Sequence, residues 1–490
     1  MRNSFCRVPV PLSSSRADLR IAVLADSDTR WKWGALTARR LAPDTGPHQV
    51  TGYLLRGRAT PTARQLGEVG AGGATEVTCA DFLAELRRER YDVVVLALVG
   101  GAVQAVLHGV RALWPEPAAR PVLVTGYVGV VYEKLADGLL LRHGADLVLA
   151  NSRHDAERFR AVYEGVGAAA AAVTETALPF LDGAPYESAG GRAHRVVFAV
   201  QPSVPESRAD RTYLLARAAG HARLHQDREV LVKLRSRPGE HTTHLEEHPY
   251  QRLADRLPGG LPPNCRLVYG NMGEVLDTAD LLVTVSSTAA LESLHRGIPT
   301  AVLTDLGIRE TLGNHHFLGS GCLTSWDHLD TGHLPTPSPR WLATQGVRPA
   351  TPTSRGAHPP RPGPPAGTAP AASTATPPGD PAAAPPYAAH DAHDAHAAAR
   401  ARLDELLAAG QLPPVDPYYT LATAPGYLPG ILARQHLAPD GTPLPGAVRR
   451  GAGESAARRW LRAHLREAAR GAYRHGVQRV APAIRRLGEL

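Results

Sequence analysis

Residues Ala279–Pro299 read ADLLVTVSSTAALESLHRGIP, and this segment indicates the fold class most clearly. The apolar run Leu281–Val285 predicts a buried strand, the polar residues 286–288 predict a loop, and Ala289–Arg296 predicts a helix. A buried strand that passes through a short loop into a helix is half of a βαβ unit. The stretch therefore predicts a parallel sheet covered by helices.

The same alternation of strands and helices extends outward over two parts of the chain. The first part predicts strands at 19–25, 49–55, 92–98, 121–125 and 145–150, with helices at 33–41, 80–90, 103–113 and 155–163. The second predicts strands at 195–200, 229–234, 265–269, 281–285 and 300–303, with helices at 211–225, 272–279 and 289–296. We expect an α/β protein with two Rossmann-like domains, 17–185 and 190–345, and ligands bound between them beyond the carboxyl ends of the strands.

The remaining chain differs in composition. Thirteen of the 38 residues from 349 to 386 are proline, so residues 349–397 are predicted to be a disordered linker. Residues 398–448 are expected to pack back onto the body. Residues 449–490 predict a basic amphipathic helix, with Trp460, Leu461 and Leu465 on one side, which either lies on an anionic membrane surface or packs on the first domain.

Charge and cysteine usage exclude several classes of protein. The net charge is +8, and the eleven arginines and three glutamates of residues 442–490 account for all of it. The neutral body lacks a basic stripe, so we expect no nucleic-acid partner. The four cysteines show no disulfide or zinc spacing, and no export signal or membrane-spanning run is present. We expect a cytoplasmic protein, with contact to the inner face of the membrane through the tail left open.

The loop before residue 289 is a candidate anion site. Hydroxyls of Ser286, Ser287 and Thr288 and the free backbone N–H groups of a helix N-terminus can bind a phosphate. Glu292, one turn later, could accept hydrogen bonds from a ribose. The alternative is an ordinary helix cap, in which these side chains satisfy backbone groups of their own helix.

The segment SSTAALE, followed by Gly297-Ile298-Pro299, resembles the nucleotide-binding region of two-Rossmann (GT-B) glycosyltransferases, especially bacterial capsule, polysialic-acid and polyol-phosphate transferases. RVVFAVQPSVP at 195–205 and LVKLRSRPGE at 231–240 are similar to further parts of that domain, although Arg235 and Ser236 replace a histidine and a proline. GADLVLANSRHDAERF at 144–159 resembles the end of the acceptor domain. The resemblance implies a nucleotide-sugar donor and an acceptor that is a glycan, a lipid or a small molecule.

Charged residues beyond two predicted strands complete the expected site. Asp26 and Asp28 follow the first strand, where an inverting enzyme needs a general base, and Lys32 and Trp33 lie close enough to contact the acceptor. Lys233 and Arg235 could clamp the departing phosphate. The alternatives are a helix-capping turn at the aspartates and a solvated loop at the basic residues.

We expect a glycosyltransferase that is metal-independent and inverting and acts in cell-surface polysaccharide or glycoconjugate synthesis. The alternatives are a polyol-phosphate transferase or a sugar-nucleotide epimerase of the same fold, or an inactive nucleotide-binding scaffold. No cofactor and no metal are expected. The Asp26–Asp28 pair directly follows the first strand, whereas the metal-binding aspartate pair of GT-A enzymes comes later in the chain. A second group of possible metal ligands stands beside low-complexity sequence and is not expected to bind a metal: His390, Asp391, His393, Asp394 and His396.

Overall fold

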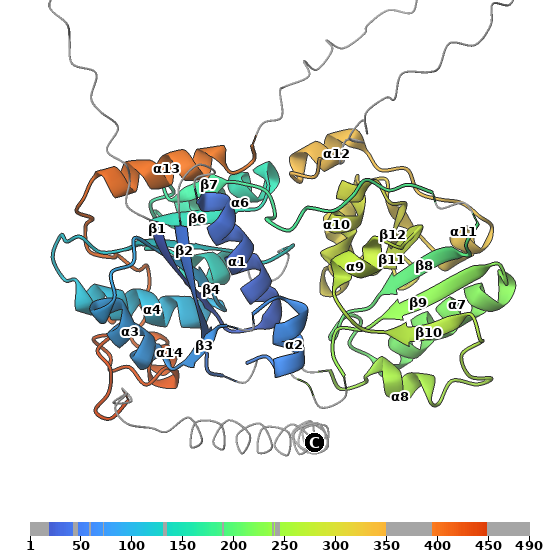
Figure 1. Cartoon of the computed structure of the whole chain (residues 1–490), viewed down its shortest axis with the longest axis horizontal. Helices are drawn as coiled ribbons and strands as arrows, with labels where there is room; N and C mark the ends of the chain where they lie inside the picture. The colour runs from blue at the N-terminus through green and yellow to red at the C-terminus, as the bar shows by residue number, and fades with distance from the viewer. Residues whose placement is uncertain are drawn as a thin grey trace, which may run out of the picture.

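The structure is a computed structural model that describes residues 19–42, 48–57, 60–71, 73–130, 135–188, 191–237, 240, 246–348 and 394–447. It contains two α/β domains side by side, each built on one sheet (Figure 1). The predicted linker up to residue 393 and the predicted basic tail lie outside the described residues. The predicted two-domain α/β architecture is confirmed.

The first domain has a seven-stranded sheet in the order β3-β2-β1-β4-β5-β6-β7, and every strand pair in it is parallel. Its strands are β1 Leu19–Ala25, β2 His48–Leu55, β3 Thr75–Val77, β4 Val93–Ala97, β5 Val122–Gly126, β6 Leu147–Ala150 and β7 Val173–Glu175. The helices between them are α1 Asp28–Leu41, α2 Ala63–Glu68, α3 Cys79–Arg88, α4 Gly100–Leu113, α5 Leu135–Leu140 and α6 Arg153–Gly165.

The second domain has a six-stranded parallel sheet in the order β10-β9-β8-β11-β12-β13. Its strands are β8 His194–Ala199, β9 Arg228–Lys233, β10 Cys265–Val268, β11 Leu281–Thr284, β12 Thr300–Leu303 and β13 Leu323–Thr324. Its helices are α7 Arg208–Leu224, α8 Tyr250–Ala254, α9 Met272–Leu276, α10 Ala289–Arg296, α11 Trp326–Asp330 and α12 Pro339–Thr344, with 3₁₀ turns η1 Glu310–Leu312 and η2 Asn314–Phe317.

The central strands are apolar along their whole length because both faces of each sheet are covered. In β1, Ile21 and Val23 face one hydrophobic cluster, and Ala22 and Leu24 face another. All four side chains are completely buried. This two-residue alternation between two cores explains why β1 reads as a continuous apolar run rather than as an alternating one.

Helix α1 begins earlier than the sequence predicted. The Ser27 hydroxyl accepts a hydrogen bond from the backbone N–H of Arg30, so Ser27 is the N-cap and Asp28 is the first helical residue. An acidic residue in the first turn is favourable because that end of the helix carries partial positive charge. Residues 28–32, which precede the helix predicted at 33–41, are therefore helical, and the side chain of Asp28 is placed by the helix.

The segment 394–447 lies against the first domain. Helix α13 (Ala397–Ala408) contacts α1, β5, β6 and β7, and α14 (Leu428–Arg434) contacts α4 (Figure 1). Between the two helices, Leu412 exchanges backbone hydrogen bonds with Ala118, and the Arg120 guanidinium donates to the carbonyl of Pro413. Leu428 and Leu432 have no exposed surface. This segment is therefore part of the first domain's core.

Candidate functional site

The residues that follow the carboxyl ends of β1 and β9 meet across the domain boundary. Arg235 Nη2 lies 2.8 Å from Asp28 Oδ1 and donates to Thr29 Oγ1 at 2.7 Å. The side chains of Arg235 and Asp28 are 29% and 16% exposed, respectively. The structure thus joins the predicted phosphate clamp of the second domain directly to a predicted base of the first.

Asp26 and Asp28 differ in their partners. Asp26 pairs with Arg30 at 2.7 Å and accepts a hydrogen bond from the backbone N–H of Val99, so it is held inside the first domain. Asp28 accepts from the backbone of Thr29 and from Arg235. Burial raises the pKa of Asp28, but Arg235 and the hydrogen bonds from Thr29 outweigh burial and bring the pKa below its ordinary value.

A second ion pair joins the domains at Lys32 and Glu292. Lys32 Nζ lies 3.3 Å from Glu292 Oε2, and the ammonium lies 4.9 Å from the centre of the Phe180 ring. Glu292 is buried, and burial raises the pKa of its carboxyl although Lys32 opposes the shift. The residue predicted to bind a ribose is therefore paired with the residue predicted to bind the acceptor.

The three hydroxyl residues before α10 have different surroundings. Ser286 is buried, and its hydroxyl donates to the carbonyl of Leu312 at 2.6 Å, so that proton serves the domain's own packing. Ser287 Oγ accepts from the backbone N–H of Ala289, the first residue of α10, whereas the N-cap residue Thr288 makes no side-chain capping bond. Thr288 Oγ1 lies 3.4 Å from the backbone nitrogen of Val130 in the first domain. Thr288 is thus the member of the three that faces the other domain.

Lys233 and Trp33 are placed differently from the sequence-based expectation. The Lys233 ammonium is buried and donates to the carbonyl of Leu234 at 2.7 Å, and burial lowers its pKa to about 8. Trp33 has no exposed surface and packs in the core of the first domain beside Gly126. The prediction that Trp33 contacts an acceptor is wrong, because its face of α1 turns toward the sheet.

Charged residues on α2 that the sequence did not predict as functional contact the second domain. The Arg64 guanidinium pairs with Glu240 of the second domain and with Glu68 one turn later in α2. The side-chain amide of Asn271 donates to the carbonyl of Glu68 at 3.1 Å. No local pattern could have identified this group, because Arg64 and Glu240 are 176 positions apart.

Two histidines also meet across the domain boundary. His154 of α6 and His316 of η2 lie with their ring centroids 6.3 Å apart, and His316 also contacts Trp341. Burial, together with smaller contributions from the nearby His154 and Arg158, lowers the pKa of His316 to about 4. His316 is therefore a neutral packing residue at neutral pH.

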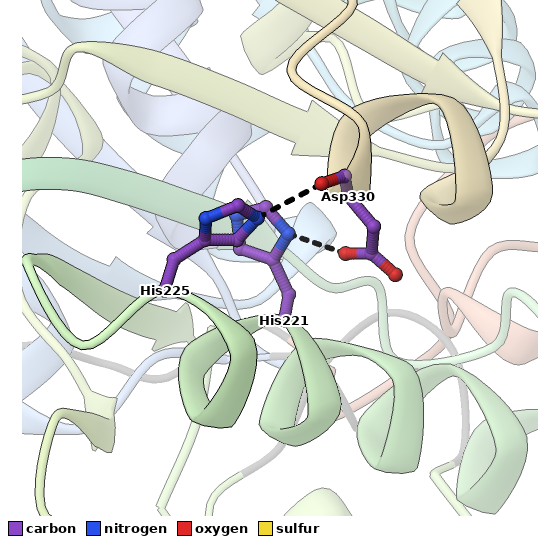
Figure 2. A group of neighbouring side chains, drawn as sticks. All are labelled: His221, His225 and Asp330. Carbon is purple, nitrogen blue, oxygen red and sulfur yellow. Dashed lines mark hydrogen bonds and ion pairs between the residues drawn. The ribbon is translucent and has the colours of Figure 1, made fainter.

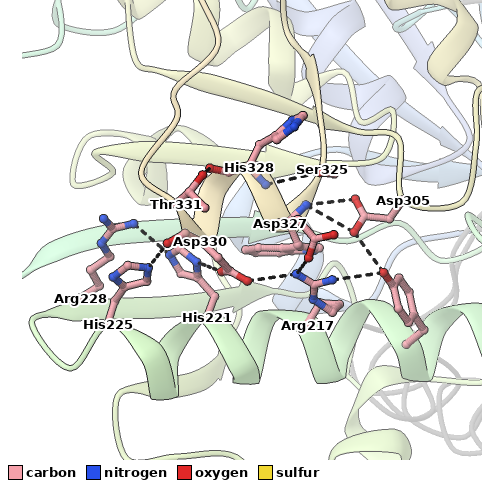
Figure 3. A network of polar contacts seen from close by, with 12 residues as sticks. Arg217, His221, His225, Arg228, Asp305, Ser325, Asp327, His328, Asp330 and Thr331 are labelled. Carbon is pink, nitrogen blue, oxygen red and sulfur yellow. Dashed lines mark hydrogen bonds and ion pairs between the residues drawn. The ribbon is translucent and has the colours of Figure 1, made fainter.

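One cluster among the described residues has donor atoms spaced for a metal ion: His221, His225 and Asp330, within 4.8 Å of one another (Figure 2). Each already has a protein partner. His221 Nδ1 lies 2.6 Å from Asp330 Oδ1, His225 Nε2 lies 3.1 Å from the Asp330 carbonyl, and Arg228 contacts His221 Nε2 at 3.1 Å (Figure 3). Arg217 contacts the other carboxylate oxygen of Asp330 at 3.0 Å. Two adjacent guanidiniums disfavour a further cation, so we interpret the cluster as a link between α7 and α11.

This cluster also lies away from the candidate site. His221 and His225 lie at the end of α7, immediately before β9 begins, whereas Arg235 follows the end of β9. The two groups therefore lie at opposite ends of β9, the first near its amino end and the second beyond its carboxyl end. Two more residues of the predicted metal-type set are described: Asp394 pairs with Arg400, and His396 is buried before α13. His390, Asp391 and His393 lie outside the described residues.

Comparisons with known proteins give a family and several structural relatives. UDP-GlcNAc 2-epimerase from Neisseria meningitidis bound to UDP-GlcNAc matches with a TM-score of 0.44 at 9% identity, covering 68% of this chain and 95% of that one. The glycosyltransferase SnogD from Streptomyces nogalater matches with a TM-score of 0.38 at 16% identity, covering 64% and 88%. Spinosyn rhamnosyltransferase SpnG matches with a TM-score of 0.37 at 13% identity, covering 67% and 90%.

No curated protein matches the sequence of this chain. A family match covers residues 21–358, which include both sheets except the first two residues of β1, both aspartates after β1 and the whole of α10. The family is described as "Putative glycosyltransferase (DUF6716)". Since the match extends over more than half of the chain, the protein belongs to this glycosyltransferase family.

Proposed function

We propose that the protein transfers a sugar from a nucleotide-activated donor, bound on the second domain, to an acceptor hydroxyl bound on the first. The observation that carries the proposal is the contact of Asp28 with Arg235, which joins a carboxylate and a guanidinium from the two domains at the carboxyl ends of β1 and β9. Parallel α/β domains bind their ligands beyond the carboxyl ends of the strands. Family membership supports the reaction class.

The proposed reaction is an inverting displacement. The acceptor oxygen forms a bond to the anomeric carbon, the bond from that carbon to the phosphate oxygen breaks, and the electron pair leaves with the nucleotide. The acceptor proton passes to a carboxylate, for which Asp28 is the first candidate because it faces the second domain, whereas Asp26 is bound by Arg30 and Val99. Arg235 and the amino end of α10 would stabilise the phosphate charge without a metal.

The test has two stages. Thermal unfolding is first measured with CMP, CDP, UDP and GDP, because a ligand at one hundred times its dissociation constant adds about 2.7 kcal/mol to stability. Sugar esters of the stabilising nucleotide are then assayed for release of free nucleotide, which a transferase produces and an epimerase without net hydrolysis does not. The variant Thr288→Val tests whether the amino end of α10 binds the phosphate. Its control is Thr420→Val, in the segment 394–447 of the first domain. If no nucleotide stabilises the protein, the proposed donor site is wrong.

We further propose synthesis of a cell-surface polysaccharide or glycoconjugate as the biological setting, with the basic tail on an anionic membrane surface. The support is the sequence alone, since residues 449–490 lie outside the described residues and account for the whole net charge of +8. Within the described part of the chain, every helix falls short of the length or hydropathy that a bilayer span requires. Sedimentation with vesicles containing phosphatidylglycerol should remove the full chain from solution but not a chain ending at residue 447.

A further inference from the structure

We propose that Asp28 and the donor phosphate compete for Arg235, so that donor binding releases the carboxylate that then accepts the acceptor's proton. The inference rests on the proposed function and adds an order of events to it: the base is held by Arg235 until a phosphate takes its place. Arg235 is accordingly a positioning residue for Asp28 before the donor binds and a phosphate ligand afterwards.

The contacts of Arg235 support an exchangeable guanidinium. The same nitrogen, Nη2, contacts Asp28 Oδ1 at 2.8 Å and Thr29 Oγ1 at 2.7 Å, and both partners belong to the other domain. The side chain is 29% exposed, so it can turn toward a ligand. Arg211 of the same domain shows the opposite case, with a guanidinium that is 1% exposed and donates to the carbonyls of Gln201, Pro202, Pro205 and His248.

The charge balance around Asp28 explains why an exchange would activate it. Burial raises the pKa of Asp28, and the Arg235 guanidinium is the main group that lowers it. Transfer of Arg235 to a phosphate therefore leaves a partly buried carboxylate with a higher pKa, which is a stronger base. Two other charged groups face this position, Arg64 and Lys233, and both interact electrostatically with Asp28. They stay near the carboxylate after the exchange.

Asp26 provides a contrast on the same loop. Its oxygens are bound by Arg30 and by the backbone N–H of Val99, all within the first domain. A phosphate that captures Arg235 would not change these contacts. The structure thus gives one aspartate a partner that a donor can remove and the other a partner that a donor cannot.

The test compares the affinity for a nucleoside diphosphate among variants by calorimetry. The probe is whichever of CDP, UDP or GDP stabilises the wild type most, and the matching nucleoside without phosphate serves as the ligand control. Asp28→Asn removes the competing charge, so it should tighten diphosphate binding by about fivefold, the equivalent of roughly 1 kcal/mol. Arg235→Ala should weaken binding, and Asp28→Asn should have no further effect in the Arg235→Ala background. Nucleoside affinity should not change in any variant.

Matched variants keep the result interpretable. Asp416→Asn removes an aspartate that pairs with Arg111 on the exposed surface of the first domain, and it should leave diphosphate affinity within twofold of wild type. Thr29→Val removes the second contact of Arg235 together with the hydrogen bond that the Thr29 hydroxyl donates to Asp28 Oδ1 at 3.3 Å. It should tighten binding by about twofold, which tests the same competition if Asp28→Asn does not fold.

The two hypotheses fail in different ways. If no diphosphate binds the wild type, the proposed function fails and the inference with it. If the diphosphate binds and Asp28→Asn leaves its affinity unchanged or weakens it, the exchange is wrong while the donor site stands. A gain in Asp28→Asn that persists in the Arg235→Ala background would also overturn the exchange, because the gain would not depend on the guanidinium.

Discussion

The ion pair between Lys32 and Glu292 should stabilise the contact between the domains. Replacing Lys32 by methionine leaves the Glu292 carboxylate, whose side chain is 8% exposed, without its cation. Breaking a buried ion pair from one side costs about 3–5 kcal/mol, and because the Lys32 side chain is 24% exposed we expect about 2 kcal/mol. Methionine keeps an unbranched side chain of similar length but loses the contact of the ammonium with the Phe180 ring, so the loss reports the whole contribution of the charge.

The double variant Lys32→Met/Glu292→Met separates the charge effect from packing. Replacing both members of a buried ion pair by apolar residues of similar size is close to neutral, so the double variant should regain most of the lost stability. Arg39→Met serves as the control, because Arg39 is exposed on the same helix and its loss should change stability by less than about 0.5 kcal/mol.

The cost should also depend on pH. The pKa of Glu292 is already raised in the folded protein, mainly by burial, and Lys32 is the main group that lowers it. Without Lys32 the pKa rises further, so the deficit of Lys32→Met should be largest at pH 8 and should shrink as the carboxyl becomes protonated at lower pH. Urea unfolding followed by circular dichroism at pH 8 and pH 5 measures both effects. The reasoning would be refuted if Lys32→Met lost no more stability than Arg39→Met. It would also be refuted if the double variant were no more stable than Lys32→Met alone.

Three further predictions concern stability. His316 has a pKa of about 4 in the folded protein and about 6.5 when unfolded, so the stability it contributes is complete above pH 6.5 and is lost as the pH falls toward 4. In His316→Gln, the urea concentration at the unfolding midpoint should therefore change less with pH over this range than in the wild type. Gly126→Ala would place a Cβ 2.8 Å from the backbone oxygen of Leu149 and 2.9 Å from the Trp33 ring, and should lower stability by about 1–3 kcal/mol in urea unfolding. Leu428→Ala should cost about 2–5 kcal/mol in calorimetry because the side chain is completely buried against the first domain; a change below about 0.5 kcal/mol would show that this segment docks only loosely.

Several elements could be predicted from the sequence because their pattern is local. The predicted strand at 19–25 and helix at 289–296 coincide with β1 and α10. Strands covered on both faces read as apolar runs, and the Gly297 residue that ends α10 adopts a left-handed conformation that glycine tolerates. The strands β3, β7 and β13 have two or three residues each, which is too short for any period to be visible. The parallel two-domain architecture follows from the longer elements alone.

The residues of the candidate site could likewise be predicted only in part from the sequence. The local pattern predicts which polar residues follow the carboxyl ends of β1, β9 and β11, because the carboxyl ends of parallel strands lie on the same side of their sheet. The folded chain was needed to establish that Arg235 pairs with Asp28 across 207 positions, that Lys32 contacts Glu292, and that Trp33 packs in the core. Such pairings depend on how two separately folded sheets pack against each other, and no local pattern of residues encodes that orientation.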